Sequence, residues 1–333
     1  MKTFIFLPPL RRESGGLAVL RRLGVMLRNA GFPVCFVLWE ASKSAAESGV
    51  DILYWQELRL QAGDIWLTPE GWPNALLPAL SAGARSLIYA QSWAYVLSCE
   101  PPNTRLENLP LEFLVVSEPV ARFVDMSLGK RASVLRPGID TALFCPSQER
   151  KDDASLRVAY MPRKNRAFAR HIREIAAVRM RRRTPSLSLE WMSIEDCSQA
   201  EVARILQTAH LFLSTGFPEG CPLPPLEALA CGCVPVGFTG LGGWDYMRQA
   251  ADFPGAAPGP LWPLRETPWA GNGFYAADAD VPGAAFALEA ALDIFVRGGE
   301  ELAVLRRAGQ ATAAAYSPAA HELAVTTLWS TSA

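Results

Sequence analysis

Short apolar runs alternate along most of the chain with longer stretches in which apolar residues recur every three or four positions. The runs of the first half are Thr3–Leu7, Val34–Trp39, Ile65–Thr68, Leu87–Ala90, Phe113–Ser117 and Ala132–Leu135. Those of the second half are Arg157–Met161, Leu187–Met192, Leu211–Ser214, Val234–Phe238 and Gly273–Ala276. Strands that alternate with helices build parallel sheets, so the pattern predicts an α/β protein with two doubly wound, Rossmann-like domains.

A charged and polar segment at residues 147–154 is interpreted as the linker between these domains. We expect a first domain over residues 1–146 and a second over residues 155–315. A last helix, Pro318–Trp329, is expected within the remaining residues 316–333. The chain has 333 residues, of which 50% are hydrophobic, so it is long and apolar enough for two cores.

The stretch LFLSTGFPEGCPLPPLEALACGCVPV, residues 211–236, carries the clearest chemistry. Its first apolar run ends in a turn that leads to Glu219, and a proline-rich turn then opens a helix that carries Glu227. The prolines between these acids fit only a loop or the first turn of a helix, so the helix should begin near Leu223. Helix N-termini attract anions, so both carboxylates are expected to line one cleft beside an anion-binding site.

Composition excludes several classes of function. The formal net charge is −1, which gives no overall attraction to nucleic acid or acidic membranes. The seven cysteines form no CxxC pair, so the chain is interpreted as a reduced, intracellular protein without a zinc site. The first residues, MKTFIFLPPLRR, are interpreted as a strand rather than a signal peptide. No apolar run approaches the length of a membrane span, about 18 residues.

The spacing of Glu219 and Glu227, together with the following ALACGCVPV, resembles the signature of the retaining nucleotide-sugar glycosyltransferases of the glycogen-synthase-like type (group 1, family four). That family has the GT-B fold, in which two Rossmann-like domains face each other across a cleft and the last helix crosses back to the first domain. The resemblance implies that Glu219 contacts the donor sugar and that Glu227 holds the nucleotide ribose. It also implies that the intervening residues lie against the donor diphosphate, which adds Gly220, Cys221 and Leu223 to the donor-binding set.

Pro222 departs from the family pattern. It stands where the family often has glycine, and it has no N–H to offer a phosphate, so Cys221 and Leu223 would have to supply the backbone donors. Thr215, in the turn before Glu219, completes the expected donor-binding residues of this segment.

The segment MPRKNR, residues 161–166, follows the first strand of the second domain. The family places an arginine and a lysine near this position to hold the diphosphate; here Arg163 and Lys164 are adjacent, and Arg166 stays an alternative. Cationic side chains neutralise the charge that grows on a pyrophosphate leaving group as the sugar bond breaks. The resemblance therefore implies that Glu219, Arg163 and Lys164 form the catalytic set.

Two motifs of the first half are expected to contact ligands. Gly15 and Gly16 open an apolar-periodic helix, where glycine lets backbone approach a ligand, although a plain turn would suit the same residues. The family has a glycine-rich loop here that faces the donor, so both are assigned to donor binding. Ligands of doubly wound folds bind at the carboxyl ends of strands, so the residues that end the fourth apolar run are assigned to the acceptor side: Gln91, Ser92 and Trp93.

Other chemistry-bearing residues receive simpler interpretations. Asp278 and Asp280 match the DxD spacing of metal-binding glycosyltransferases of a different fold, and they are interpreted as a surface turn. Asp245 is the candidate for an acid that the family often carries in the loop after Val234–Phe238. None of the three histidines is assigned to catalysis. Positive charge gathers at the first helix and could meet an anionic acceptor or only water: Arg11, Arg12, Arg21, Arg22 and Arg28.

The resemblance implies a metal-independent enzyme that moves a sugar from a nucleotide diphosphate sugar to an acceptor hydroxyl with retention of configuration, and no cofactor is expected. The acceptor stays open between a glycan, a lipid-linked molecule and a nucleic-acid base hydroxyl, and the expected location is cytoplasmic, with or without peripheral contact to a membrane. One alternative is a catalytically silent nucleotide-sugar-binding subunit of a glycosylation assembly, because Gln91 stands where many relatives have a histidine or an acid. The other is a GT-B nucleotide-sugar epimerase, although the chain offers no evident acid/base set for it.

Overall fold

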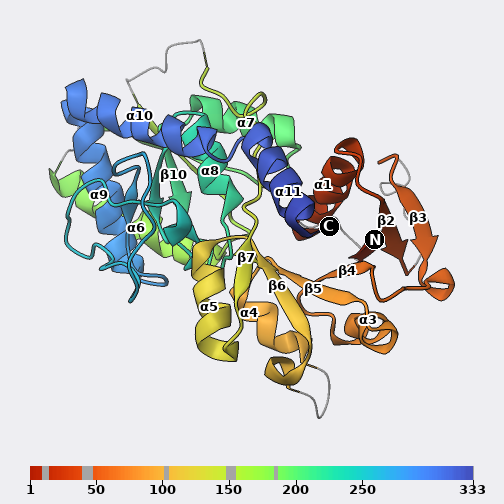
Figure 1. The fold of residues 1–333 in the computed structure, drawn as a ribbon. Coiled ribbons are helices and arrows are strands. Elements are labelled where there is room, and N and C mark those ends of the chain that lie inside the picture. Colours follow the sequence, from red (N-terminus) through yellow and green to blue (C-terminus); the bar gives the residue numbers. More distant parts are fainter. Residues whose placement is uncertain (10–14, 40–47, 101–104, 148–154, 184–186, 333) are drawn as a thin grey trace. The chain divides into compact units, whose positions relative to one another are not determined.

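The computed structural model describes residues 1–9, 15–39, 48–100, 105–147, 155–183 and 187–332. The chain divides into two compact units, and each is described by itself (Figure 1). Unit 1 comprises Met1–Pro137 with Ala319–Ala333, and unit 2 comprises Gly138–Pro318. None of the helices in the described ranges is both long and apolar enough to cross a membrane.

Unit 1 is built on a seven-stranded parallel sheet with the order β3-β2-β1-β4-β5-β6-β7. The chain runs outward from β1 to β3 and then returns to β4 on the other side of β1. The carboxyl ends of β1 and β4 therefore form the switch point at which ligands of doubly wound folds bind. The strands are β1 (Thr3–Leu7), β2 (Val34–Leu38), β3 (Asp51–Tyr54), β4 (Ile65–Pro69), β5 (Arg85–Ala90), β6 (Leu111–Val115) and β7 (Ala132–Val134).

Helices cover both faces of the unit 1 sheet. On one face α1 packs so closely that a Cβ on Gly24 would lie 2.3 Å from the Phe36 ring. On the other face α3 packs over a core that includes Phe6 and Trp66. The last helix returns to this unit, where the Trp329 indole N–H donates to the Thr3 hydroxyl at 3.0 Å. The helices are α1 (Gly15–Asn29), α3 (Leu77–Ala82), α4 (Trp93–Val96), α5 (Glu118–Leu128) and α11 (Pro318–Ser332).

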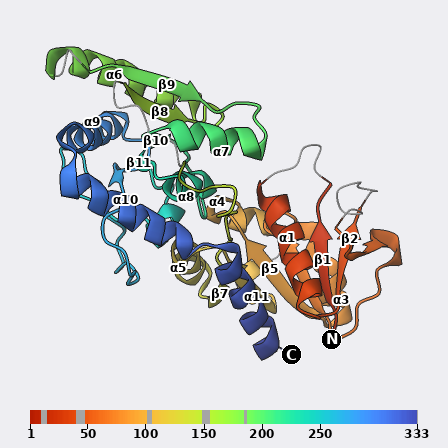
Figure 2. The same cartoon turned by 90° about the horizontal axis from the view of Figure 1, so that it is seen from above.

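Unit 2 has a five-stranded parallel sheet with the order β12-β11-β10-β8-β9. Figure 2 shows β8 and β9 beside α6. Helices α6 and α9 cover one face of the sheet, α7 and α8 the other, and α10 contributes to both cores. The strands are β8 (Leu156–Tyr160), β9 (Leu189–Ser193), β10 (Leu211–Ser214), β11 (Val234–Gly237) and β12 (Phe274–Tyr275). The helices are α6 (Arg166–Arg183), α7 (Gln199–Thr208), α8 (Leu223–Ala230), α9 (Val281–Arg297) and α10 (Gly299–Ala314).

The structure confirms the predicted fold class, with two parallel sheets flanked by helices and a C-terminal helix that belongs to unit 1. Strand β3 was not predicted, because its residues are largely exposed at the sheet edge and form no buried apolar run. The division between the units falls at Pro137 rather than at residue 146. Its physical reason is that Ile139 and Phe144 are buried in the unit 2 core, where Ile139 N donates to Tyr316 O at 2.8 Å.

Candidate functional site

Three of the expected site residues of unit 2, Lys164, Thr215 and Glu219, meet at the carboxyl ends of β8 and β10. A narrow pocket of about 10 Å³ opens there, lined in part by Lys164, Thr215, Glu219 and Pro222. The Lys164 ammonium forms an ion pair with the Glu219 carboxylate, and their side chains are 32% and 17% exposed. A cation and an anion from two separate loops thus stand together in a sheltered but accessible place.

Asn165 holds these two loops together. It lies in the left-handed region, with φ of 64°, which asparagine adopts more readily than most residues. Its side-chain amide donates to Thr215 O at 2.6 Å, and the Thr215 hydroxyl donates back to Lys164 O. Sequence reasoning missed Asn165, although an asparagine directly before a helix that follows a strand was a signal for such a turn.

The backbone of Glu219 is fixed by the loop that follows β11. Glu219 N donates to Gly240 O at 2.9 Å, and Gly242 N donates to Glu219 O at 3.0 Å. A Cβ on Gly242 would lie 1.9 Å from Gly220 O, and Gly240 has φ of 67°. These two glycines therefore let the segment that carries Glu219 lie close to the loop after β11.

The acids of the neighbouring segments have structural partners. Asp245 is fully buried, accepts a hydrogen bond from the Tyr316 hydroxyl, and lies 3.6 Å from the Arg265 guanidinium. It therefore stabilises the loop after β11 rather than facing a ligand. Asp278 accepts from Gly240 N at 2.8 Å, and burial raises its pKa. Asp280 caps α9 by accepting from Gly283 N at 3.0 Å.

Within the described ranges, no three His, Cys, Asp or Glu side chains gather in an arrangement that could hold a metal ion.

The start of α8 offers few backbone donors. In the run of residues 222–225 only Leu223 has an N–H, because the other three are prolines. The Tyr246 hydroxyl donates to Pro222 O at 2.7 Å and fixes this turn. Gly220 is buried, whereas Cys221 and Glu227 are half-buried. Glu227 lies one turn inside α8 and is not among the residues that line the narrow pocket.

The three candidate cations of the MPRKNR segment have different surroundings. Only Lys164 pairs with Glu219. Arg166 instead pairs with Glu195, in the loop after β9. Arg163 is exposed, and its guanidinium lies 4.0 Å from the Met161 sulfur. The geometry therefore favours Lys164 as the cation that reaches a ligand beside Glu219.

The expected residues of unit 1 gather at the switch point of its sheet. The Gln91 side-chain amide donates to Gly16 O at 3.0 Å, so the end of β5 touches the start of α1. A Cβ on Gly16 would lie 3.1 Å from the Gln91 amide oxygen, so this contact favours glycine, whereas a Cβ on Gly15 would meet nothing within 4 Å. Trp93 packs against Phe123, with 5.7 Å between the ring centroids.

Glu70 is the residue of this region that sequence reasoning missed. It follows β4, and its carboxylate accepts from Gln91 N at 2.9 Å and from Ser92 N at 2.8 Å. Burial raises the pKa of Glu70 to about 7, even though these two hydrogen bonds act in the opposite direction. The Ser92 hydroxyl oxygen is buried and has no hydrogen-bond partner among the described residues. An acid directly after a buried strand at the switch point was the available signal.

Solved structures with similar folds cover nearly the whole chain. A glycosyltransferase from Rickettsia africae ESF-5 has 12% identity and a TM-score of 0.69, and the match covers 99% of this chain and 97% of that one. Sucrose-phosphate synthase from Thermosynechococcus elongatus has 14% identity, a TM-score of 0.68 and 99% coverage of both chains. The catalytic domain of starch synthase IV from Arabidopsis thaliana, bound to ADP and acarbose, has 13% identity, a TM-score of 0.62 and coverage of 99% and 98%.

No protein-family model and no curated protein matches the chain. At identities this low, likeness to solved structures establishes the fold and leaves the activity to be argued from the site. The two parallel sheets with their helices, and the C-terminal helix, give the chain the GT-B fold of these glycosyltransferases.

Proposed function

We propose that the chain is a retaining glycosyltransferase that moves a sugar from a nucleotide diphosphate sugar to an acceptor hydroxyl. The observation that carries the proposal is the ion pair between Lys164 and Glu219 at the carboxyl edge of the unit 2 sheet. A cation suits a diphosphate, and a carboxylate suits sugar hydroxyls, so the two partners of this pair match the two halves of such a donor. The fold supports the proposal, since the starch synthase with a similar fold is bound to ADP.

In the proposed reaction the residues of the chain bind and orient the substrates. The bond between the anomeric carbon and the diphosphate oxygen breaks, and the bond to the acceptor oxygen forms on the same face of the sugar. The acceptor proton passes to the leaving phosphate. Lys164 stabilises the charge that grows on the diphosphate, and Glu219 accepts hydrogen bonds from the sugar hydroxyls. Donor binding therefore replaces the ion pair by two contacts to the ligand.

The remaining donor residues take roles that the family resemblance implies. Glu227 holds the ribose, and Arg163 adds a second positive charge at the exposed rim of the site. The Leu223 N–H donates a hydrogen bond to the diphosphate, because it is the N–H that remains in the proline-rich turn. In unit 1, Gly15 and Gly16 are proposed to approach the donor, and Gln91, Ser92 and Trp93 the acceptor.

The roles of Lys164 and Glu219 can be distinguished by comparing the binding of a nucleoside diphosphate with that of the matching nucleotide sugar. A thermal-shift screen of nucleotide sugars identifies the donor, since a ligand at 100 times its dissociation constant stabilises by about 2.7 kcal/mol. Lys164→Met is expected to lower the affinity for both ligands, because each carries the diphosphate. The loss of a hydrogen bond to a charged group, about 1.5–3 kcal/mol, corresponds to a decrease in affinity of roughly 10- to 150-fold.

Glu219→Gln is expected to lower only the affinity for the nucleotide sugar, because the nucleoside diphosphate lacks the sugar that Glu219 contacts. Arg166→Gln is the matched control, since Arg166 pairs with Glu195 outside the pocket and should leave both affinities unchanged. The proposal would be refuted if Lys164→Met bound both ligands with wild-type affinity and unfolded at the wild-type temperature. That result would show that Lys164 does not contact the donor.

A catalytically silent donor-binding subunit is the second candidate. The observation in its favour is that three of the residues 222–225 lack an N–H, which leaves the diphosphate fewer backbone donors than a helix start normally offers. Incubation with the identified nucleotide sugar, followed by proton NMR of its anomeric region, separates the candidates. Slow hydrolysis with retained configuration identifies an enzyme, whereas a changed sugar configuration identifies an epimerase. An unaltered donor identifies the silent subunit.

A further inference from the structure

Strand β9 (Leu189–Ser193) forms an edge of the unit 2 sheet in the described part of the chain. The corresponding edge of unit 1 is covered, because β3 pairs with β2 outside the first two strands. Unit 2 repeats the order of the unit 1 sheet from β2 onward, but its described residues include no counterpart of β3 at this edge. An uncovered strand edge offers main-chain hydrogen-bonding groups to another extended segment.

The hydrogen-bond pattern shows which residues of β9 face this edge. Leu156 N donates to Ser188 O, and Ile194 N donates to Tyr160 O, both within the parallel pairing of β8 with β9. In a parallel strand successive residues direct their main-chain groups to opposite sides, so every second residue faces β8. The residues between them direct their N–H and C=O groups to the open edge: Leu189, Trp191 and Ser193.

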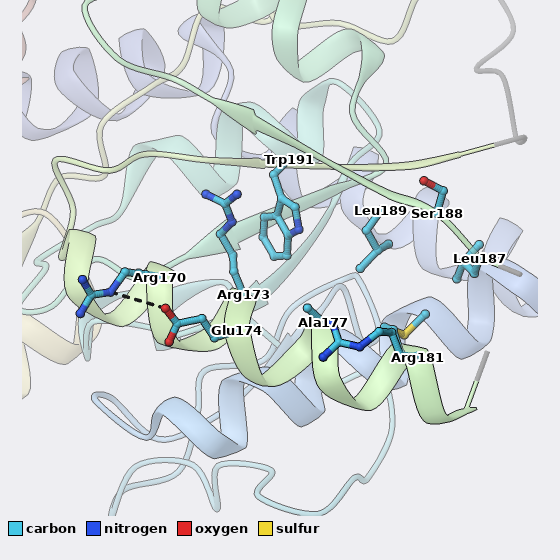
Figure 3. Close-up of a pocket in the computed structure, with 10 residues that line it drawn as sticks. Arg170, Arg173, Glu174, Ala177, Arg181, Leu187, Ser188, Leu189 and Trp191 are labelled. Carbon is cyan, nitrogen blue, oxygen red and sulfur yellow. Dashed lines mark ion pairs between the residues drawn. The ribbon is translucent and has the colours of Figure 1, made fainter. Parts of the chain in front are cut away.

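A groove runs between β9 and α6 beside the same edge (Figure 3). Its volume is about 670 Å³, and Leu189 and Trp191 from β9 contribute apolar side chains to its lining. Two of the residues that present main-chain groups at the edge, Leu189 and Trp191, thus also line the groove. A segment added to β9 would place alternate side chains over this groove, because side chains alternate between the two faces of a sheet.

The groove carries a net positive charge. Three arginines of α6 and one acid line it: Arg170, Arg173, Arg181 and Glu174. Glu174 lies 3.8 Å from Arg170 in an ion pair, whereas Arg173 and Arg181 have no acidic partner among the residues that the structure describes. Arg173 is held in place, because it donates to the Tyr160 hydroxyl at 2.7 Å and lies 5.0 Å from the centre of the Trp191 ring.

We propose that β9 and the groove beside α6 form a docking site for an acidic, extended segment of a partner protein, which adds to the sheet as a further strand. The main-chain groups of β9 bind the backbone of the segment, and Arg173 and Arg181 bind acidic side chains at alternate positions. Charge complementarity selects the acidic partner, and the uncovered edge selects its extended conformation. The site is independent of the proposed donor site, so either can fail without the other.

Two labelled octapeptides test the charge requirement by fluorescence anisotropy. One alternates valine with glutamate, and the other alternates valine with lysine. The acidic peptide is expected to bind, with an affinity that falls as salt is added, because surface charges are screened. The basic peptide is expected not to bind. Amide NMR shifts of Leu189, Trp191 and Ser193 on addition of the acidic peptide would place it at the edge of β9.

Matched variants at Ser193 test the strand pairing. Ser193→Pro removes an N–H that faces the edge and leaves the pairing with β8 intact, since proline is tolerated on edge strands. It is expected to lower the affinity for the acidic peptide about five- to tenfold, because one backbone hydrogen bond is lost. Ser193→Ala keeps that N–H and should bind as the wild type does. Arg173→Gln and Arg181→Gln should each weaken binding, and thermal unfolding checks that all variants are folded.

Three results would overturn the proposal. Equal binding of the two peptides would show that charge does not select the partner. Equal affinities of Ser193→Pro and Ser193→Ala would show that the peptide does not pair with β9. Sedimentation that reveals a dimer of the wild type, dissociated by Ser193→Pro, would show that a second copy of the chain occupies the edge instead.

Discussion

Glu70→Gln is expected to remove a pH dependence from the stability of unit 1. Burial raises the pKa of Glu70 from 4.5 to about 7 in the folded state. Because the folded pKa is the higher one, the contribution of Glu70 to stability is fully present below about pH 4.5 and is lost as the pH rises through about 7. At 1.36 kcal/mol per pH unit, the full contribution is about 3 kcal/mol, of which about 2.5 kcal/mol is lost between pH 5 and pH 8.

The variant keeps the shape of the side chain but cannot titrate. Glutamine has one acceptor oxygen, so it can serve only one of the two N–H groups, of Gln91 and Ser92, that the carboxylate binds. Leaving the other unpaired costs about 1–3 kcal/mol at every pH. The difference between wild type and variant in free energy of unfolding should therefore change by about 2.5 kcal/mol from pH 5 to pH 8, with the wild type losing its advantage.

Urea unfolding followed through the alkylation of Cys35 measures this difference in unit 1. Cys35 is buried in β2, and it becomes reactive when the unit opens. His321 of α11 has a pKa lowered to about 4 by burial, but it is present in both proteins and cancels in the difference. Glu107→Gln, at an exposed position, is the matched control and should reproduce the pH dependence of the wild type. The same stability difference at pH 5 and pH 8 would refute the reasoning.

Three further outcomes are expected. Gly242→Ala should destabilise unit 2 by about 1–3 kcal/mol, because its Cβ would lie 1.9 Å from a carbonyl oxygen. Gly63→Ala, whose Cβ would meet nothing within 4 Å, is the control and should not destabilise the protein. Equal melting temperatures of the two variants would contradict this expectation. Glycosyl transfer should survive excess EDTA, because Lys164 supplies the positive charge for the diphosphate. If EDTA abolished transfer and magnesium or manganese restored it, a metal ion rather than Lys164 would supply that charge. If the arginines of α1 bind an anionic acceptor, Arg21→Ala/Arg22→Ala should flatten the fall of acceptor affinity with salt, and identical slopes would show a solvated helix face.

Arg28 is left unchanged in that last variant because the structure gives it another role. Its guanidinium donates to Ser48 O at 2.7 Å, so its removal would disturb the backbone before β3. Arg11 and Arg12 of the expected basic group lie outside the described residues. Because its guanidinium is engaged in this way, Arg28 is a poorer candidate for contact with an acceptor than the sequence suggested.

The parts of the fold that the sequence predicted are those in which burial leaves a pattern. The central strands, such as β1 and β10, are buried along their whole length and therefore appear as apolar runs. Strand β3 is exposed at an edge and leaves no such run. Helices α9 and α10 are separated at Gly298 and Gly299, which both have positive φ values, 63° and 72°. Glycines can continue or end a helix, and their conformation depends on packing that local sequence does not contain.

Similar reasons separate the predicted site residues from the missed ones. Glu219 and Lys164 were predicted from a motif, and the structure brings them together. Asn165 and Glu70 act through long-range hydrogen bonds, to Thr215 O and to the backbone after β5, and no local spacing reveals such contacts. The roles of Glu219 and Lys164 toward a ligand, and those of the other assigned residues, stay predictions.

Both units fix a carboxylate at the carboxyl edge of the sheet, but they balance its charge differently. Glu219 faces the ammonium of Lys164, so a full positive charge opposes it. Glu70 binds two backbone N–H groups and has no cationic partner among the described residues, so only dipoles oppose its charge in a buried place. Glu70 is therefore the carboxylate that titrates near neutral pH, and its ionisation decides how firmly the backbone of Gln91 and Ser92 is held. A change in acceptor affinity around pH 7 that Glu70→Gln abolishes would locate acceptor binding at the switch point of unit 1, whereas a change that the variant retains would move it elsewhere.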